Sequence, residues 1–175
     1  MRANLLKFQK EQSIPLLQEA GAKTTVSPVS VSNEWDPLEE VIVGTISGAR
    51  LPDWHLSVEA VIPQQYQKFF QQHSGAFFPE EDVAAAQREL DNLANFLERQ
   101  SIIVRRPEEI TLTQPIHTPF FQASGGMYHA MPRDSVLIIG NLIIEAPMSW
   151  RNRYFETFAF RQIFKEYLKG GAGPV

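Results

Sequence analysis

The sequence predicts an α/β fold, because strand and helix patterns alternate along it. A helix pattern over residues 80–100 follows the short apolar run 41–43 and leads directly into the β-branched run 102–104. Strand, helix and strand in this order are typical of a βαβ unit. Farther along, two apolar runs separated by Gly140 and Asn141 predict a β-hairpin.

Residues 1–29 are expected to form an N-terminal extension or linker, and residues 30–175 the folded part. Residues 2–20 have a weak helix pattern that Pro15 interrupts, and residues 21–30 are rich in Thr, Ser, Pro and Val. In the folded part, a turn at Asp36-Pro37 should lead into the strand 41–43. Trp35, just before that turn, is expected to be a packing anchor.

Two helices are predicted before the second strand. Tyr66, Phe69 and Phe70 recur at helical spacing and indicate a short helix. The helix over residues 80–100 is better defined, because Pro79 suits its first turn and three acidic residues follow at its N-terminus. Its apolar stripe is expected to be packing surface and consists of Val83, Ala86, Leu90, Leu93 and Leu97.

The hairpin strands are expected over residues 136–139 and 142–144, with a two-residue turn between them. Because both runs are almost continuously apolar, they suit strands that are covered on both faces or lie in a buried core hairpin. Arg133 and Asp134 lie where the first strand should begin. From the residues alone, this charged pair is either a local ion pair that caps the strand or a rigidly held functional site.

The last helix is expected over residues 152–168. Bulky apolar residues would form one face of it, and Gly170 and Gly171 would end it. The apolar face consists of Phe155, Phe158, Ile163, Phe164 and Tyr167.

Composition excludes several classes of function. A net charge of −4 favours neither nucleic acid nor an anionic membrane as a partner, and no apolar run approaches the length of a spanning helix. Residues 1–10 have no signal-peptide core, so a cytoplasmic protein is expected. There is no cysteine, which removes thiolate metal sites and cysteine nucleophiles from these residues. His55 and His73 lack metal-ligand spacing, and no metal site is expected.

Three blocks of the sequence are distinctive: NEWDPLEEVIVG at 33–44, VRRP at 104–107, and MPRD at 131–134 followed by GN at 140–141 and IEAPMSWR at 144–151. In this order and spacing they closely resemble the N-terminal part of the arginine:glycine amidinotransferase family. The resemblance extends over almost all of residues 32–170. It implies a pentein fold, an α/β propeller of repeated ββαβ modules, of which this chain would hold about the first module.

The resemblance also implies a reaction and one binding residue. The family transfers the amidino group of arginine to an amine acceptor through a cysteine-bound intermediate, and it needs no cofactor or metal. The catalytic cysteine, histidine and aspartate are expected beyond Val175, so this chain alone would be inactive. Asp134 is implied to bind the substrate guanidinium, because a carboxylate can pair bidentately with that planar group. No role is carried over to Arg151 or Arg153, and Arg133 is expected to be a structural partner.

Alternatives remain open at this point. The chain is the N-terminal portion of an amidinotransferase, or a shortened non-catalytic relative that acts as a binding or assembly module. A guanidine hydrolase or deiminase is disfavoured by the block at 33–44. The loop 118–122 carries an aromatic where the animal enzyme is acidic, so the acceptor is undecided. An incomplete propeller should expose apolar surface and strand edges, so a homo-oligomer or a missing C-terminal portion is an expected partner.

Overall fold

The computed structural model describes residues 27–174, and the expectations for residues 1–26 lie outside them. Strand β1 (Glu40–Ile42) pairs in parallel with β2 (Ile103–Arg105), with Val41 opposite Val104. Between these strands in sequence lie three helices: α2 (Leu56–Glu59), α3 (Gln64–Gln72) and α4 (Glu80–Arg99). The predicted order of strand, helix and strand is confirmed, as are the two predicted helices.

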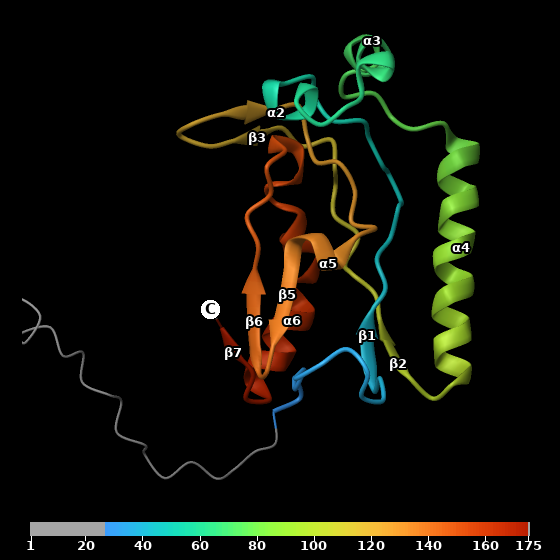
Figure 1. Ribbon diagram of the computed structural model, residues 1–175, viewed down its shortest axis with the longest axis vertical. Coiled ribbons are helices and arrows are strands. Elements are labelled where there is room, and N and C mark those ends of the chain that lie inside the picture. The colour runs from blue at the N-terminus through green and yellow to red at the C-terminus, as the bar shows by residue number, and fades with distance from the viewer. Residues whose placement is uncertain (1–26, 175) are drawn as a thin grey trace, which may run out of the picture.

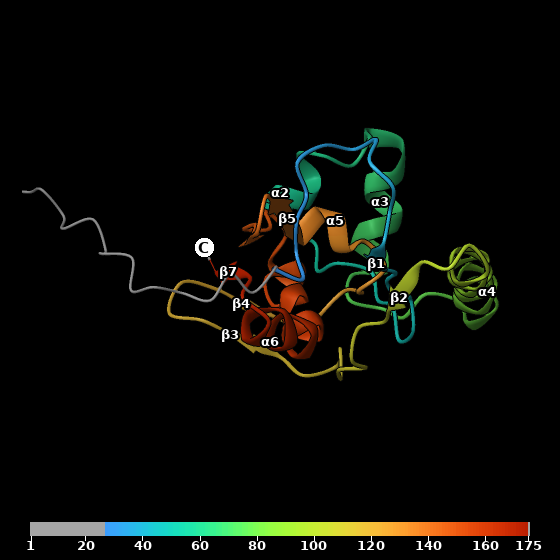
Figure 2. The same cartoon turned by 90° about the horizontal axis from the view of Figure 1, so that it is seen from below.

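Helix α4 stands at one side of the molecule, next to β2 (Figures 1 and 2). Pro79 precedes it, and three acidic residues occupy its first turn, as expected for the positive end of a helix. Its apolar stripe is covered only in part, because Ala94 is the one buried residue of the helix, whereas Leu93 and Phe96 are about half exposed. The expected packing face is therefore incomplete in the described residues.

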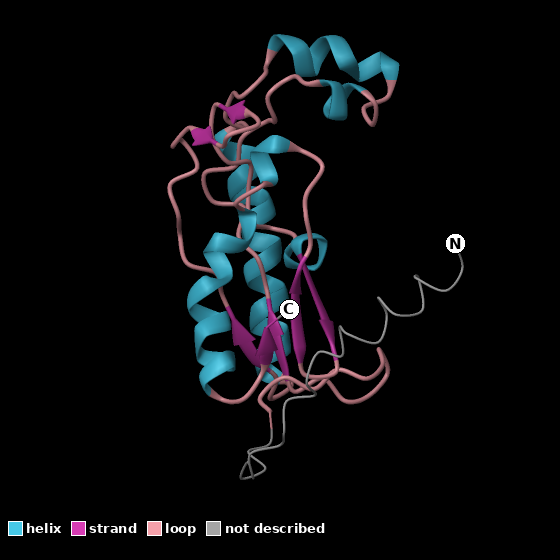
Figure 3. Cartoon of the chain, turned by 90° about the vertical axis from the view of Figure 1, so that its left-hand side faces the viewer, coloured by secondary structure: helices cyan, strands magenta, loops and turns pink. Residues whose placement is uncertain are grey.

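A second pair of strands, β3 (Ile116–His117) and β4 (Gln122–Ala123), is antiparallel and lies with α2 and α3 at one end of the molecule (Figure 1). The longer strands lie at the other end (Figures 1 and 3). Just after β4 the backbone of Gly125 runs so close to the loop before β3 that an added Cβ would lie 2.2 Å from the carbonyl oxygen of Leu112. Gly125 is thus a position where only glycine fits.

The predicted hairpin is confirmed. Strands β5 (Val136–Ile139) and β6 (Leu142–Glu145) pair in antiparallel fashion, and Gly140 between them has a φ of 58°. Strand β7 (Gly173–Pro174) adds in parallel to β6. The three strands form one sheet, with β6 in the centre.

The two faces of this hairpin differ. Val136 and Ile143 are buried and belong to the same cluster as the helix residues that pack on the sheet. On the opposite face, Leu137 and Ile139 are half exposed, and Leu142 is over a third exposed. The expectation that both faces are covered is therefore wrong for the described residues, because the helices of this chain cover only one side of the sheet.

The single helix expected over residues 152–168 is broken. The chain forms two 3₁₀ turns, η1 (Arg151–Arg153) and η2 (Glu156–Phe160), before α6 (Arg161–Lys169). Arg153 ends η1 and Glu156 begins η2, and the two side chains form an ion pair across the turn between them. The predicted end is confirmed, since Gly170 caps α6 and Gly171 takes a φ of 103°.

The core is formed by the inner face of the hairpin and one face of α6. Its residues are Val29, Val136, Ile143, Phe160, Ile163, Phe164, Tyr167 and Ala172. Val29 belongs to the expected extension, yet it is buried here; the boundary at residue 30 stays a prediction.

Trp35 is 84% exposed, so the expectation that it anchors packing is wrong. The turn is instead closed by the Asn33 side chain, which accepts hydrogen bonds from the backbone of Trp35 and Asp36.

Candidate functional site

Asp134 lies in the single helical turn α5 (Pro132–Ser135), directly before β5, rather than on the strand itself. Pro132 occupies the first turn, and the Asp134 amide donates to the carbonyl of Met131 at 3.1 Å. Ser135 is fully buried, and its carbonyl accepts from the amide of Ala146 at 2.9 Å. The backbone on either side is thus held by hydrogen bonds, while the Asp134 side chain is 47% exposed.

The partner of Asp134 is Arg153, which comes from η1. Nη1 of Arg153 donates to Oδ2 of Asp134 at 2.9 Å, and Nε donates to Oε2 of Glu156 at 2.7 Å. The guanidinium also lies over the ring of Tyr128, 5.2 Å from its centroid. Arg153 and Glu156 are both buried, so a guanidinium is held among two carboxyl groups and an aromatic ring.

The charges in this cluster are strongly affected by burial. Burial raises the pKa of Glu156 to about 7, although the neighbouring Arg153 opposes the rise. Burial is the largest single effect on the pKa of Arg153 and disfavours its charged form, but its hydrogen bonds to Glu156 and Asp134 and the negative charge of Glu156 together outweigh burial and raise the pKa, so the guanidinium stays charged. Burial also raises the pKa of Tyr128. Within the described residues, Nη2 of Arg153 and Oε1 of Glu156 are buried without a hydrogen-bond partner.

The local pair of Arg133 and Asp134, one of the two interpretations of the sequence, does not form. Arg133 donates instead to Oε1 of Glu34 at 2.6 Å, and both of these side chains are largely exposed. Arg133 therefore ties the turn before β1 to α5. No motif in the sequence assigns a role to Arg153. A local signal for its pair with Glu156 is present, because opposite charges three residues apart favour contact on a helix, but the burial of this pair has no such signal.

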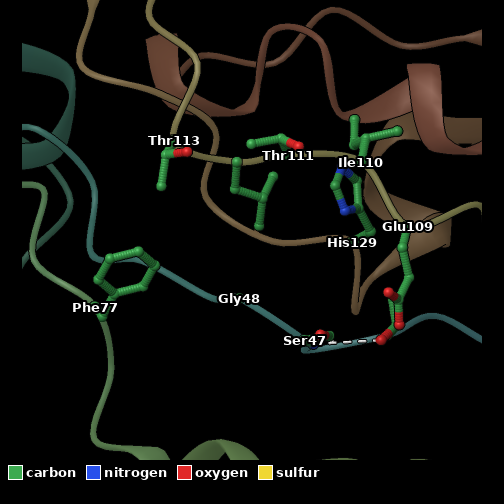
Figure 4. Close-up of a pocket in the computed structure, with 10 residues that line it drawn as sticks. Ser47, Gly48, Phe77, Glu109, Ile110, Thr111, Thr113 and His129 are labelled. Carbon is green, nitrogen blue, oxygen red and sulfur yellow. Dashed lines mark hydrogen bonds between the residues drawn. The ribbon is translucent and has the colours of Figure 1, made fainter.

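Two cavities lie near this region, and Asp134 lines neither of them. One, of about 220 Å³, is shown in Figure 4, with Phe77 at one end and the Glu109 carboxyl pointing toward Ser47 at the other. The second, of about 170 Å³, is bordered by Glu156 and Tyr128. His129 lines both cavities, and burial lowers its pKa to about 4, so it is neutral at pH 7.

Arg50 joins the loops around these cavities, a role that no local pattern in the sequence indicated. Its guanidinium donates to the carbonyl oxygens of Gly75, Leu112 and Ser124. Asn152 adds a further link, since its amide donates to the carbonyl of Gly125 at 2.8 Å. These hydrogen bonds satisfy loop carbonyls that pair with no strand.

Two general findings concern the described residues. No group of three or more His, Asp or Glu side chains in residues 27–174 is close enough to hold a metal ion. No helix in the same part of the chain is long and apolar enough to cross a bilayer.

Comparison with known proteins identifies the relatives of this chain. No protein-family model matches it. The L-arginine:L-lysine amidinotransferase of Pseudomonas savastanoi pv. phaseolicola is 47% identical over 146 residues, which cover 83% of this chain and 40% of that protein. The mitochondrial glycine amidinotransferase of Danio rerio is 47% identical over 145 residues, covering 83% of this chain and 34% of the relative.

Solved structures of amidinotransferases also resemble this chain. SxtG, an amidinotransferase of the saxitoxin biosynthetic pathway from Microseira wollei, superposes with a TM-score of 0.77 at 40% identity, covering 84% of this chain and 42% of that one. The inosamine-phosphate amidinotransferase StrB1 from Streptomyces griseus gives a TM-score of 0.77 at 38% identity, covering 85% and 42%. The chain thus spans less than half the length of the relatives it matches. Over the part that it shares with them, the chain belongs to the amidinotransferase family, as its motifs indicated.

Proposed function

We propose that this chain forms the part of an amidinotransferase that binds the guanidinium of arginine, with Asp134 as the contacting carboxylate. The observation that carries the proposal is the setting of Asp134. Its backbone is fixed in α5, one carboxylate oxygen is held by Arg153, and its side chain is still 47% exposed. A carboxylate that is both fixed and accessible suits the recognition of a planar cation.

The proposed reaction proceeds in two steps. A cysteine thiolate attacks the guanidinium carbon of arginine, the bond between that carbon and Nε breaks, and ornithine leaves after its nitrogen takes up a proton from an acid. An amine acceptor then attacks the enzyme-bound amidino carbon, loses a proton to a base and displaces the thiolate. Binding of the guanidinium by Asp134 would orient its carbon for the first attack.

The remaining groups must come from outside these residues. The 175 residues contain no cysteine, so the thiolate, with its histidine and aspartate, would be supplied by polypeptide beyond Val175 or by a partner chain. The coverage of about 40% of the arginine:lysine relative fits a portion of a larger propeller. In this proposal, the described sheets and helices form about the first ββαβ module of a pentein domain, and the acceptor is an amine of undetermined identity.

The test is arginine-dependent release of ornithine by the protein isolated from its source. Replacing Asp134 by Asn should lower kcat/KM for arginine by about 10- to 100-fold, because a charge-assisted hydrogen bond contributes about 1.5–3 kcal/mol. Asp91 offers a matched control, since it pairs with Arg106 at the same 2.9 Å and is similarly exposed. Asp91→Asn should change kcat/KM by less than about twofold. An equal effect of the two substitutions would refute the role of Asp134.

A second function is favoured by a separate observation, the exposed apolar face of the hairpin with Leu137 and Ile139. In a shortened non-catalytic relative, this face would serve binding or assembly. Two measurements on the source protein separate the proposals. Mass spectrometry gives the length of the native chain, and chemical cross-linking with sedimentation gives its partners. A native chain of 19.9 kDa without a cysteine-bearing partner, and without ornithine release, would support the binding module and overturn the enzyme.

A further inference from the structure

We infer that Arg153 is a positioning residue for arginine binding: it holds one oxygen of Asp134 and leaves the other free to meet the substrate guanidinium. The inference rests on the proposed function and assigns a task to a residue that the motifs left without one. The two oxygens of the Asp134 carboxylate differ in their contacts. Oδ2 accepts from Arg153, whereas Oδ1 makes no hydrogen bond within the described residues.

The guanidinium of Arg153 is itself held rigidly. Glu156 fixes it through Nε, Asp134 through Nη1, and the Tyr128 ring covers its plane. The planar fork of arginine can satisfy all three contacts at once, which a lysine ammonium cannot do with the same geometry. Because the Arg153 side chain is only 9% exposed, it provides an anchor that does not move with the solvent-exposed end of Asp134.

The charge of the cluster supports binding of a cation. Asp134 and Arg153 alone would cancel, and a neutral pair attracts a guanidinium only weakly. When Glu156 is ionised, the three side chains together carry a charge of −1, so the attraction for a cation returns. Ionised Glu156 therefore both holds the Arg153 guanidinium in place and offsets the positive charge that Arg153 brings to the cluster.

A purely structural ion pair is a weaker explanation. The pairs of Arg106 with Asp91 and of Arg133 with Glu34 are both substantially exposed, as is usual for pairs on a protein surface. The Arg153 cluster instead buries a guanidinium and a carboxyl group and leaves one buried polar atom on each unpaired. Such burial costs more free energy than packed apolar residues would, so the cluster is a poor device for stability alone.

The experiment is a double-substitution cycle on the native protein, with L-arginine as the probe. Arg153→Gln should weaken arginine binding by roughly tenfold or more, comparable to the about 10- to 100-fold loss when a residue that orients a metal ligand is replaced. In the Asp134→Asn background, Arg153→Gln should have no further effect, because its action passes through Asp134. Arg106→Gln is the matched control and should leave arginine binding unchanged.

Two additional readouts distinguish positioning from structural support. Arg153→Gln should raise the KM for arginine. Arg153→Lys should restore part of the arginine affinity, since it keeps a cation near Oδ2. Additive effects of the two substitutions in the cycle, or a failure of Arg153→Lys to restore any arginine affinity, would overturn the inference.

Failure of the inference and failure of the proposed function are distinguishable. If Asp134→Asn leaves arginine binding unchanged, the proposed function is overturned and the inference falls with it. If Asp134→Asn weakens binding but Arg153→Gln does not, only the inference is overturned. Arg153→Gln could fail to fold because it leaves the buried Glu156 carboxyl without a partner. In that case the double variant Arg153→Gln/Glu156→Gln replaces the charges by a neutral amide pair and must show the same loss of arginine affinity.

Discussion

Glu156 should make the protein less stable as pH rises from 4.5 to 7. Its pKa is 4.5 in an unfolded chain and about 7 in the fold, because burial disfavours the carboxylate. Between these values the folded state holds a proton that the unfolded state has released. Stability from this group is therefore complete below pH 4.5 and is lost as pH rises through 7. At about 1.4 kcal/mol for each tenfold change in proton affinity, the loss is about 3 kcal/mol.

The substitution that isolates this effect is Glu156→Gln, which has a similar shape and no titrating group. Urea unfolding of both proteins, followed by tryptophan fluorescence at intervals from pH 4 to 8, gives the free energy of unfolding at each pH. The wild-type value minus the variant value should fall by about 3 kcal/mol between pH 4.5 and 7. All other titrating groups are common to both proteins and cancel in this difference.

The direction in which the difference in unfolding free energy changes with pH shows whether burial or the attraction to Arg153 controls the Glu156 charge. A difference that grows with pH would mean that attraction to Arg153 dominates and that the folded pKa of Glu156 lies below its unfolded value. A difference that stays constant would mean that the carboxyl group titrates alike in both states. Either result would refute the view that burial controls the charge of this cluster.

Three further predictions concern other parts of the molecule. Burial lowers the pKa of His129 to about 4, below its unfolded value of 6.5. Its contribution to stability is therefore complete above pH 6.5 and is lost on acidification through pH 4. The free energy of unfolding of the wild type minus that of His129→Gln should rise by about 3 kcal/mol from pH 4 to pH 6.5. Gly125→Ala should cost at least about 2 kcal/mol in urea unfolding, because its Cβ would lie 2.2 Å from the Leu112 carbonyl; a smaller loss would contradict the close approach. Phe160→Ala should lower the free energy of unfolding by about 3–5 kcal/mol, since this ring is fully buried. Leu137→Ser, on the exposed hairpin face, should change it by less than about 0.5 kcal/mol. Similar losses for the two variants would mean that both hairpin faces are covered.

Helices and strands whose formation depends on nearby residues in the sequence could be predicted. The hairpin depends on two apolar runs and on the tolerance of Gly140 for positive φ, both visible in the sequence. The start of α4 follows from Pro79 and the acidic residues after it. In both cases, residues within a few positions of one another carry the whole signal. The three motif blocks at 33–44, 104–107 and 131–151 together identified the family, which the comparisons confirmed.

The break in the last helix was missed because nothing in the residue pattern marks it. The aromatic spacing over residues 152–168 suits a continuous helix. The first part of that segment instead forms two 3₁₀ turns, and Arg153, at the end of the first, pairs with Glu156 and Asp134. Helical periodicity records which residues face the core, but it does not record where a buried charge finds its partners.

The sequence by itself determined the family, the strand and helix order, and Asp134 as the residue to examine, since these are encoded in motifs and short-range periodicity. Only the tertiary structure decided the partner of Asp134. Its neighbour Arg133 turns away to Glu34, and Arg153, nineteen residues along the chain, takes the place beside it. The exposed face of the hairpin was likewise decided by which helices reach it. Ion pairs and covered surfaces form wherever packing places groups together, and distance along the chain does not set that placement.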